Sequence, residues 1–592
     1  MLLRLRSALR LTDTRPLLFL RGSTRSMSAK TIAVLDDSAL RDGEMKEVDF
    51  EQGKVLLSRL GDKIHATSAF CTHYGAPLAK GVLTADGRVV CPWHGACFNV
   101  ETCDIEDAPA PSALHRFGAH VADGKIWVTA NPSYTEKANM SRPPKLSTAG
   151  FDAVGTVNNL FESPLRCQNT NEAKGTVIIG GGSGAYHAVV SLREHGYKYP
   201  ITIVSKEPHA PIDRTKLSKA LITDASKLEW KSAADLKIRY GVNLRVGVEA
   251  TSINFQEHKV VLDGGKDSIS YEKLILASGG TPRKLPIEGV DFENVYTFRG
   301  VQDANKVDAA AQEGKKLVVI GSSFISMELV TAVSKRKLAS IDVIGMEEYP
   351  FEAVLGKEVG AGLKKYHESQ GVKFHMQTKV EKIVPQEGNP NLAGGVVING
   401  ETIPADFVVM GVGVAPATQF IKDSGIEVEK DGGVLVNEFL EVSKLPAGVE
   451  GVYAIGDIAI YPQHGYQVRI EHWNVAGNHG RAVGKTIAGD PQPFVKTPVF
   501  WSAQGQQLRY CGYVHGYDDV IITGDPGEMK FIAYYVKDSK VVAVASMQND
   551  PVVSKSSELL RLGLMPSPEE LRGGKDPLTV DMSTVNALQR VA

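Results

Sequence analysis

Two cysteine–histidine pairs lie close together near the start of this 592-residue chain. One residue separates Cys71 from His73, and after 17 further residues Cys91 and His94 follow, separated by two. Two thiolates and two imidazoles can hold a [2Fe–2S] cluster in which the cysteines ligate one iron and the histidines the other. A zinc ion could use the same four ligands, but zinc sites usually pair Cys with Cys and His with His along the chain. The mixed spacing therefore favours the iron–sulfur cluster.

The residues around these ligands, CTHYGAPL and CPWHGACF, resemble the cluster-binding loops of Rieske proteins. High-potential Rieske proteins have an extra cysteine in each loop and hydroxyl groups that donate to the cluster. The corresponding positions here hold Ala76, Trp93, Ala96 and Phe98. Because fewer hydrogen bonds to the sulfurs stabilise the reduced state less, these residues predict a low-potential centre.

A glycine-rich segment after the apolar run Thr176–Ile179 has the pattern of a dinucleotide-binding turn. Gly180, Gly182 and Ala185 have the G-x-G-x-x-A spacing, which lets a pyrophosphate approach the backbone at a helix N-terminus. Glu207 follows the next apolar run, 201–204, and is the candidate ligand of the adenosine ribose.

Three further segments resemble those of ferredoxin-reductase-like flavoproteins, and this resemblance implies FAD. They are LASGGTPR with Ala277, Gly279 and Arg283, VYAIGD with Gly456 and Asp457, and DRTKLSK with Arg214 and Lys219. In that family the aspartate holds the ribityl chain and the lysine approaches flavin N5, where a fixed cation can stabilise charge on reduced flavin. Trp473, in the segment EHWN, corresponds to a position near the flavin.

A second strand–glycine–helix pattern, after Lys316–Ile320, is less regular. Gly321, Ser323 and Ser326 occupy the three glycine positions, and Glu328 matches an acid that relatives place near the nicotinamide. The place of this pattern between the FAD segments resembles the NAD(P)H domain of the same family. Glycine stands where NAD-preferring relatives have glutamate, so Glu347 is the remaining ribose candidate, and no arginine lies nearby to bind a 2′-phosphate. NADH is therefore favoured over NADPH, although a domain that has lost nucleotide binding is the alternative.

The order of these motifs resembles that of apoptosis-inducing-factor-like flavoproteins with an N-terminal Rieske domain, the apoptosis-inducing factor 3 type. The resemblance implies a multidomain fold: an all-β Rieske domain, two doubly wound α/β (Rossmann-like) domains for FAD and NAD(P)H, and an α+β C-terminal domain. The expected boundaries are 1–30 for a transit peptide, 31–131 for the Rieske domain, 132–174 for a linker, 175–300 and 431–490 for the FAD domain, 301–430 for the NAD(P)H domain and 491–592 for a C-terminal interface domain.

The first 30 residues contain six arginines and four serines against one acidic residue, Asp13. This composition is typical of a mitochondrial transit peptide, and the alternatives are a basic tail or a start at Met27. No apolar run approaches the roughly 20 residues that cross a bilayer. The net charge of −2 gives no bulk electrostatic case for nucleic-acid binding.

Together the motifs predict an NAD(P)H-dependent oxidoreductase that passes a hydride to FAD and single electrons to the cluster and an unidentified acceptor, a protein or a small molecule. No C-x₄-C follows the first glycine loop, so the flavin has no redox dithiol to reduce. The catalytic candidates are Lys219, Glu328 and Trp473. Two alternatives are direct reduction of a small molecule by the flavin and a slow redox-sensing or cell-death factor. The resemblance implies a mitochondrial location, and it leaves a homodimer open.

Overall fold

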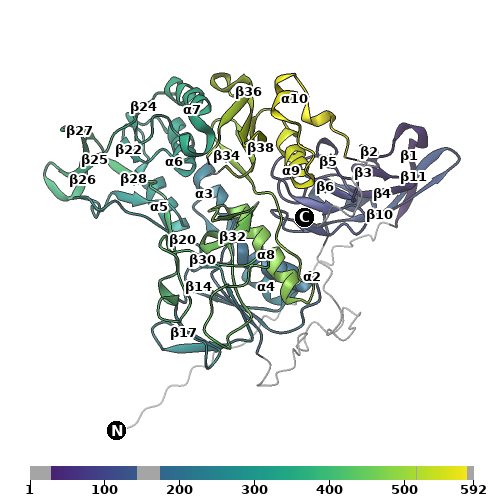
Figure 1. Cartoon of the computed structure of the whole chain (residues 1–592), viewed down its shortest axis with the longest axis horizontal. Helices are drawn as coiled ribbons and strands as arrows, with labels where there is room; N and C mark the ends of the chain where they lie inside the picture. Colours follow the sequence, from purple (N-terminus) through teal and green to yellow (C-terminus); the bar gives the residue numbers. More distant parts are fainter. Residues whose placement is uncertain (1–27, 143–173, 464, 515, 583–592) are drawn as a thin grey trace, which may run out of the picture.

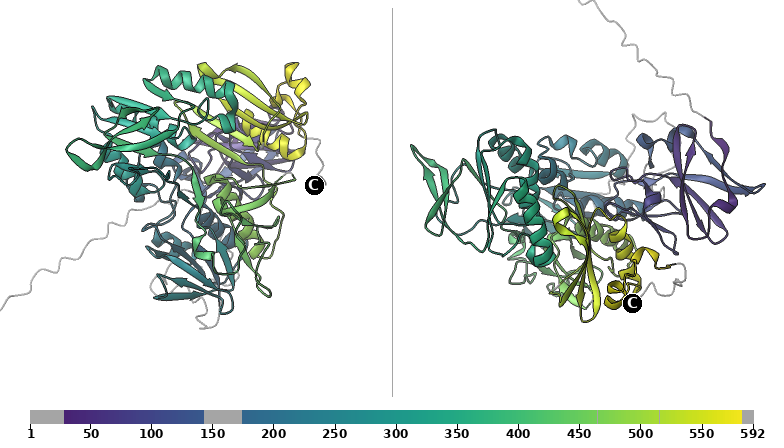
Figure 2. Two further views of the ribbon diagram at one scale, coloured as in Figure 1. Left: turned by 60° about the vertical axis from the view of Figure 1, so that its left-hand side comes forward. Right: turned by 90° about the horizontal axis from the view of Figure 1, so that it is seen from above.

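The computed structural model describes residues 28–142 and 174–582, apart from residues 464 and 515. Most of the predicted transit peptide and linker lie outside the described residues. An N-terminal all-β unit is followed by two units with parallel sheets and by a C-terminal antiparallel sheet with helices, which confirms the predicted fold class. The C-terminal unit lies between the all-β unit on one side and the second parallel-sheet unit on the other (Figures 1 and 2).

The N-terminal unit contains two antiparallel sheets. The larger one consists, in spatial order, of β1 (Lys30–Asp36), β11 (Lys125–Ala130), β10 (Arg116–Ala122), β4 (Lys63–Ser68), β3 (Gly53–Leu60) and β2 (Met45–Phe50). The smaller one consists of β5 (Val82–Leu83), β6 (Arg88–Val90), β7 (Cys97–Asn99) and β8 (Ile105–Asp107). In β11, Ile126 and Val128 are buried and alternate with more exposed residues, so one strand face packs in the core. The first predicted ligand loop follows β4, and the second connects β6 to β7.

The first parallel sheet has the glycine loop at its centre. Its strands, in spatial order, are β15 (Val242–Val246), β14 (Ile201–Ser205), β13 (Thr176–Ile179), β19 (Lys273–Leu276) and β31 (Val452–Ala454). Helix α2 (Ser183–Glu194) begins just after the loop that follows β13, and α8 (Trp473–Ile487) packs beside it. A Cβ on Gly480 would lie 2.2 Å from the carbonyl oxygen of Gly184, so these glycines permit the close helix packing that brings Trp473 towards the glycine loop.

The second parallel sheet carries the less regular nucleotide motif. Its strands, in spatial order, are β21 (Val295–Thr297), β28 (Phe407–Met410), β22 (Lys316–Ile320), β23 (Ser340–Ile344) and β24 (Val372–His375). Helix α6 (Phe324–Val333) follows β22, and α7 (Glu352–Ser369) precedes β24. Each parallel unit also carries a three-stranded antiparallel sheet, and these are β16 (Ala250–Asn254), β17 (Lys259–Leu262) and β18 (Asp267–Ser270), and β25 (Val380–Gln386), β26 (Asn389–Ile398) and β27 (Glu401–Pro404).

The C-terminal unit packs against the all-β unit through a helix. Its sheet consists, in spatial order, of β34 (Val499–Ala503), β35 (Gln507–Gly512), β38 (Lys540–Met547), β37 (Lys530–Lys537) and β36 (Asp519–Asp525). It is followed by α9 (Val552–Leu562) and α10 (Pro568–Arg572). Leu559 of α9 packs with Val90 and Cys97 of the all-β unit, and Ser554 Oγ donates to the carbonyl oxygen of Cys91 at 2.9 Å. Helix α9 therefore packs against the second ligand loop and the two strands that flank it.

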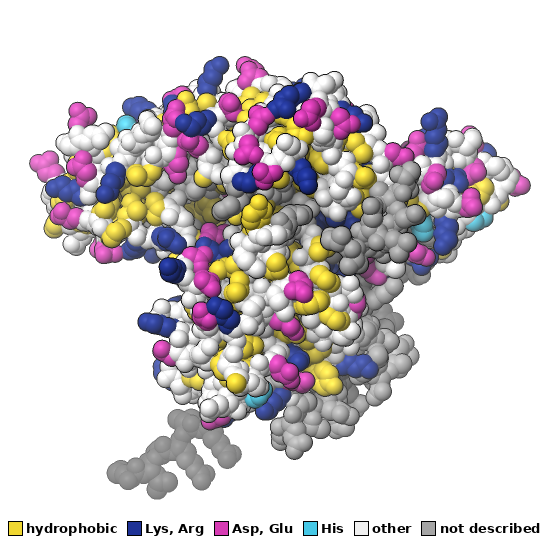
Figure 3. Space-filling model, viewed as in Figure 1, with side chains coloured by type: hydrophobic (Ala, Val, Ile, Leu, Met, Phe, Trp, Pro, Cys, Tyr) yellow, Lys and Arg dark blue, Asp and Glu magenta, His cyan; other side chains and the backbone are white. Residues whose placement is uncertain are grey.

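The surface shows no field of a single charge sign on the face drawn in Figure 3, where acidic and basic side chains are interspersed. None of the described helices is both long enough and apolar enough to cross a membrane.

Candidate functional site

The two predicted cluster-ligand loops have the same backbone course. In each loop the cysteine N–H donates to a carbonyl five residues later, and the cysteine carbonyl accepts from the N–H four residues later. These bonds are Cys71 to Ala76 (2.9 Å) and Gly75 to Cys71 (2.8 Å), and Cys91 to Ala96 (2.8 Å) and Gly95 to Cys91 (3.3 Å). Both glycines have a positive φ, +73° and +70°, which a side chain would strain. The sulfurs also accept backbone N–H groups in both loops, which stabilises thiolates.

The four ligand candidates form two like pairs. His73 Nδ1 lies 3.1 Å from His94 Nδ1, and the Cys71 and Cys91 side chains are within hydrogen-bond reach of each other. In the described part of the chain, no three Cys, His, Asp or Glu side chains converge on one point as a single metal ion would require. A cysteine pair beside a histidine pair fits a two-iron cluster and not a single tetrahedral zinc ion.

Burial keeps both candidate histidines in the form that binds metal. The side chains are almost fully buried, and this desolvation lowers the pKa of His73 to about 3 and that of His94 well below its usual value. Both imidazoles are therefore neutral at pH 7, with a lone pair available for a metal ion. His73 Nε2 is buried without a hydrogen-bond partner.

The predicted FAD segments converge at the end of the first parallel sheet. A Cβ on Gly180 would lie 2.1 Å from the Ala277 carbonyl oxygen, so the first glycine permits close contact between two of these segments. Around Gly182, by contrast, a Cβ would meet nothing within 4 Å, which leaves the open space that a pyrophosphate needs beside the N-terminus of α2. Ala185 is fully buried in the first turns of that helix. The close contact at Gly180 and the open space at Gly182 together fit the pyrophosphate of FAD.

The sequence did not single out one residue of this site, Arg299. Its Nη2 donates to Asp457 Oδ2 at 2.7 Å, and it would contact a Cβ added at Gly279. The side chain of Asp457 is only 9% exposed, and Gly456 next to it donates its N–H to His479 Nδ1 at 3.1 Å. Arg299 follows a short strand and belongs to none of the recognised motifs, so only its pairing in space reveals it.

Glu207 and Arg214 form one ion pair beside this site. Arg214 Nη2 lies 2.6 Å from Glu207 Oε2, and its Nη1 donates to the Arg299 carbonyl. Burial alone would raise the pKa of Glu207, but the charge and hydrogen bond of Arg214 outweigh burial and lower it. Glu207 is thus an ionised acceptor. Arg283 does not join this group, because it lies exposed just after β20 (Gly280–Pro282) and donates to the Val414 carbonyl at 2.9 Å.

Lys219 of the first parallel-sheet unit pairs with Glu328 of the second, and Glu328 also contacts the C-terminal sheet. Lys219, at the end of α3 (Thr215–Ala220), lies 2.9 Å from Glu328 Oε1 of α6. Ser502 Oγ of β34 also donates to Glu328 at 2.7 Å, and Ser218 Oγ donates to its other oxygen. The Ala503 N–H donates to Glu328 as well, at 3.3 Å, and the glutamate side chain is only 4% exposed. Four donors therefore satisfy a buried carboxylate that links the two catalytic candidates to the C-terminal sheet.

The predicted nicotinamide-nucleotide site has serines where the motif has glycines. Gly321 has φ +100°, and a Cβ there would lie 2.5 Å from the Gly411 carbonyl oxygen, so this first glycine is required. Ser323 Oγ donates to that same carbonyl at 3.2 Å and lies 3.3 Å from Ser326 Oγ. Glu347, after β23, accepts a hydrogen bond from Ser322 Oγ at 3.2 Å, so the carboxylate lies beside the turn where the adenosine ribose would bind.

Aromatic rings fill the boundary between the ligand loops and the reductase units. Trp501 of β34 lies 4.4 Å from the His94 ring and 5.8 Å from the His73 ring, measured between centroids. Trp473, at the start of α8, lies 6.5 Å from Trp501 and 5.5 Å from Trp230. Trp473 therefore belongs to an aromatic cluster next to the histidine pair, and its buried Nε1 has no partner.

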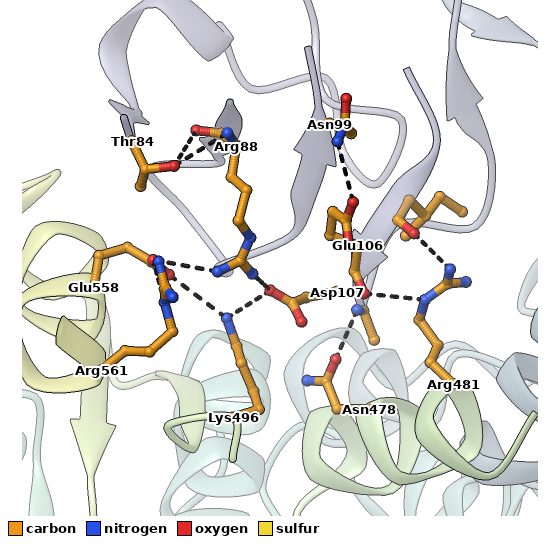
Figure 4. Close-up of polar contacts among 12 residues, drawn as sticks. Thr84, Arg88, Asn99, Glu106, Asp107, Asn478, Arg481, Lys496, Glu558 and Arg561 are labelled. Atoms are coloured by element: carbon orange, nitrogen blue, oxygen red, sulfur yellow. Dashed lines mark hydrogen bonds and ion pairs between the residues drawn. The ribbon is translucent and has the colours of Figure 1, made fainter. Parts of the chain in front are cut away.

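Buried charges fix the all-β unit on the other units (Figure 4). Asp107 accepts from Arg88 of its own unit and from Lys496 of the C-terminal segment, the latter at 2.7 Å. Glu558 of α9 lies 3.3 Å from Arg88 and 2.7 Å from Arg561. Burial alone would raise the pKa of Asp107, but the adjacent charges of Lys496 and Arg88 hold it well below its usual range. Sequence reasoning missed this network because its members are hundreds of residues apart and no motif surrounds them.

A second set of interface contacts comes from α8. Asn478 accepts from the Ala108 N–H at 2.8 Å, and Arg481 donates to the Ile105 carbonyl and pairs with Glu194 at 2.9 Å. The ligand loops are thus held against the reductase units from several directions.

The fold and these sites define a flavoprotein reductase with a Rieske domain in the same chain, and comparison with known proteins supports this class. Residues 174–480 match the pyridine nucleotide-disulphide oxidoreductase family, 30–118 the Rieske [2Fe-2S] domain and 499–579 the reductase C-terminal domain. The chain belongs to the pyridine nucleotide-disulphide oxidoreductase family, and its relatives include apoptosis-inducing factor 3 of Homo sapiens. That relative is 37% identical over 90% of this chain and 84% of its own length.

Other relatives match about two thirds of the chain. Rhodocoxin reductase of Rhodococcus erythropolis is 29% identical over 67% of this chain and 91% of its own. A solved covalent complex of putidaredoxin reductase with putidaredoxin is 25% identical, covers 67% of this chain and 95% of that chain, and superimposes with a TM-score of 0.63. These matches confirm the predicted resemblance. The protein is an NAD(P)H oxidoreductase of the flavoprotein class, with residues for FAD and for a Rieske [2Fe–2S] cluster.

Proposed function

We propose that the protein takes a hydride from NADH and delivers electrons one at a time to an external acceptor, with its own Rieske centre as the carrier. FAD supplies the step between two-electron and one-electron chemistry when it is bound. The residues that this proposal assigns to FAD are Gly180, Gly182, Ala185, Glu207, Arg214, Ala277, Gly279, Gly456, Asp457 and Trp473. Cys71, His73, Cys91 and His94 are assigned to the cluster.

The observation that carries the proposal is the position of two adjacent residues on β34. Trp501 contacts both candidate ligand histidines, and Ser502 donates to Glu328, which is paired with Lys219. Both β34 residues are almost fully buried. The cluster ligands and the candidate flavin residues are therefore neighbours in one water-excluded interior, where a tethered carrier has a far higher effective concentration than a separate one.

The candidate catalytic side chains have distinct roles in this proposal. Glu328 holds the Lys219 ammonium in place, and that fixed cation can stabilise negative charge that develops nearby on reduction. In this proposal Glu347 accounts for the preference for NADH, because its carboxylate at the adenosine ribose would repel the 2′-phosphate of NADPH. The loop alanines and Phe98 bring no hydroxyl donors to the cluster, which supports a low potential, and a redox titration measures this directly.

Electron paramagnetic resonance after anaerobic addition of NADH tests the proposed function. We expect the flavin to bleach and the reduced-cluster signal to appear in the wild-type protein. In His73→Leu the flavin should still bleach, but the cluster signal and the reduction of one-electron acceptors should be lost. An oxidised cluster beside bleached flavin in the wild type would contradict the proposal. Full turnover by His73→Leu would instead favour direct reduction of a small molecule by the flavin.

The proposed location is mitochondrial, on the composition of residues 1–30, of which 1–27 lie outside the described residues. A fluorescent protein fused behind these 30 residues should enter mitochondria, and a cytosolic signal would contradict the location.

A further inference from the structure

The two faces of the candidate histidine pair are covered by different aromatic rings. On the inner side, Trp501 contacts both histidines and is only 3% exposed. On the other side, Tyr74 stacks on His73 with 3.8 Å between ring centroids and an interplanar angle of 18°, and its ring meets the His94 ring edge-on at 5.4 Å. Tyr74 is 36% exposed. One ring thus joins the histidine pair to the reductase interior, and another joins it to the surface.

The orientation of Tyr74 is fixed from the neighbouring unit. Its hydroxyl donates to the carboxylate of Asp213, whose side chain is only 1% exposed and lies just before α3. The hydroxyl end is therefore anchored in the interior while part of the ring reaches solvent. A ring held in this way loses little conformational entropy when a partner covers it.

The other surroundings of the ligand pair are less accessible. Gly95 of the second loop packs on Val499, since a Cβ there would lie 3.2 Å from the valine side chain. Helix α9 covers the Cys91 carbonyl through Ser554. Trp93, the other aromatic residue of the loops with solvent access, contacts only His94, at 6.4 Å, and is less exposed than Tyr74. Among the described aromatic neighbours of both histidines, Tyr74 has the most exposed ring.

Two lysines flank this ring. Lys216 Nζ lies 4.9 Å from the Tyr74 ring centroid, and Lys137 lies over the next residue, since a Cβ on Gly75 would be 3.1 Å from its Nζ. Lys216 is 3.7 Å from Asp213, which offsets part of its charge, whereas Lys137 is exposed and packs over the Phe70 ring. The surface around Tyr74 is therefore an exposed aromatic ring with a cationic border.

We infer that Tyr74 is the point where electrons leave the protein, and that the acceptor is a small redox protein with an acidic contact face. The inference rests on the proposed function. In the exit step the reduced cluster loses one electron, the partner's redox centre gains it, and no proton or bond is exchanged. An acidic face is complementary to Lys137 and Lys216, and an exposed aromatic ring is a typical centre of a protein contact.

The experiment follows the reoxidation of the cluster in the full-length holoprotein. Protein reduced with NADH without oxygen is mixed with succinylated cytochrome c, an acidic one-electron acceptor, or with unmodified cytochrome c, which is basic. Freeze-quenched samples then report the decay of the reduced-cluster resonance. We expect faster decay with the succinylated protein at low salt, and a decrease of that rate as ionic strength rises.

Four variants separate the contributions. Tyr74→Leu should slow reoxidation about tenfold, the loss expected for one central aromatic contact, while Tyr74→Phe, which keeps the ring, should stay close to wild type. Lys137→Glu should slow the reaction with the acidic acceptor about tenfold at low salt and accelerate it with the basic one. Lys125→Glu, an equal charge change in the β10–β11 hairpin, is the matched control and should leave both rates unchanged.

Each outcome has one interpretation. Unchanged reoxidation in Tyr74→Leu and Lys137→Glu would overturn the inference, and a loss in Trp93→Leu instead would place the exit at that ring. If Tyr74→Leu does not assemble a cluster, Lys137→Glu against its control Lys125→Glu still tests the surface. Absence of a reduced-cluster resonance in the wild type would contradict the proposed function, so the two failures are distinguishable.

Discussion

The two ends of the proposed electron path are built in opposite ways. At the Rieske end, the ligand loops are sealed against the reductase units by buried rings and by the charge network around Asp107. At the nicotinamide end, serines replace two motif glycines, and the side chains of Ile325 and Met346 are 42% and 67% exposed. A carrier in the same chain never has to leave, so its contact can be buried, whereas a dissociable nucleotide needs an open approach.

This difference places the strongest energetic constraints at the Rieske boundary. Lys496, Arg88 and Arg561 balance Asp107, Glu558 and the nearby Asp86 there, so the buried network is neutral overall. A buried pair adds little net stability when it is complete, but the loss of one partner leaves a charge without compensation. At the nicotinamide end, the Glu347 carboxylate accepts a hydrogen bond from one hydroxyl, that of Ser322, so its loss should change stability far less.

The largest expected effect comes from Lys496→Met at the sealed end. Removing this cation leaves one buried carboxylate uncompensated, which costs about 3–5 kcal/mol. Because a multidomain protein does not unfold in one step, the amides of β8 are the better probe. Their hydrogen exchange should accelerate on the order of a hundredfold or more. Lys485→Met removes a longer and more exposed contact, 3.8 Å from Glu106, and should change exchange little; equal acceleration in both variants would contradict the role of the network.

A smaller effect is expected from a change of pH, which alters stability through His479 beside the predicted FAD residue Gly456. Burial lowers the pKa of His479 to about 3, and the neutral ring accepts the Gly456 N–H. The unfolded chain, with a pKa of about 6.5, binds the proton first, so stability is present above pH 6.5 and is lost as pH falls from there towards 3. Between about pH 7 and 5 this residue alone should cost up to about 2 kcal/mol.

The measurement for His479 is the midpoint temperature of flavin release at several pH values. His479→Gln keeps an acceptor but does not titrate, so its midpoint should fall less with pH than that of the wild type. Other buried histidines contribute to both proteins, and the difference between them isolates this residue. Parallel pH profiles would contradict the assignment.

Prediction from the sequence was most complete where the functional residues lie close together along the chain. Cys71 to His94 span a short stretch, and the glycines that follow each histidine set both loop conformations, so the ligand spacing was readable. The order of strands, glycine loops and helices likewise gave the fold class. Arg299, the Asp107 network and Tyr74 were not predicted, because their roles come from partners in distant segments and from burial, which depends on how the units pack.

The smallest effect concerns nucleotide choice at the open end. If Glu347 lies at the adenosine ribose, Glu347→Gln should remove the repulsion of a 2′-phosphate and shift the ratio of kcat/KM for NADPH to NADH by about tenfold towards NADPH. Glu348→Gln is the matched control, since that neighbouring carboxylate pairs with Lys357 at 2.6 Å. Steady-state kinetics with both nucleotides measure the ratio. An unchanged ratio in Glu347→Gln would place the ribose elsewhere, and the serine-substituted turn would then be the only part of the motif that contacts nucleotide.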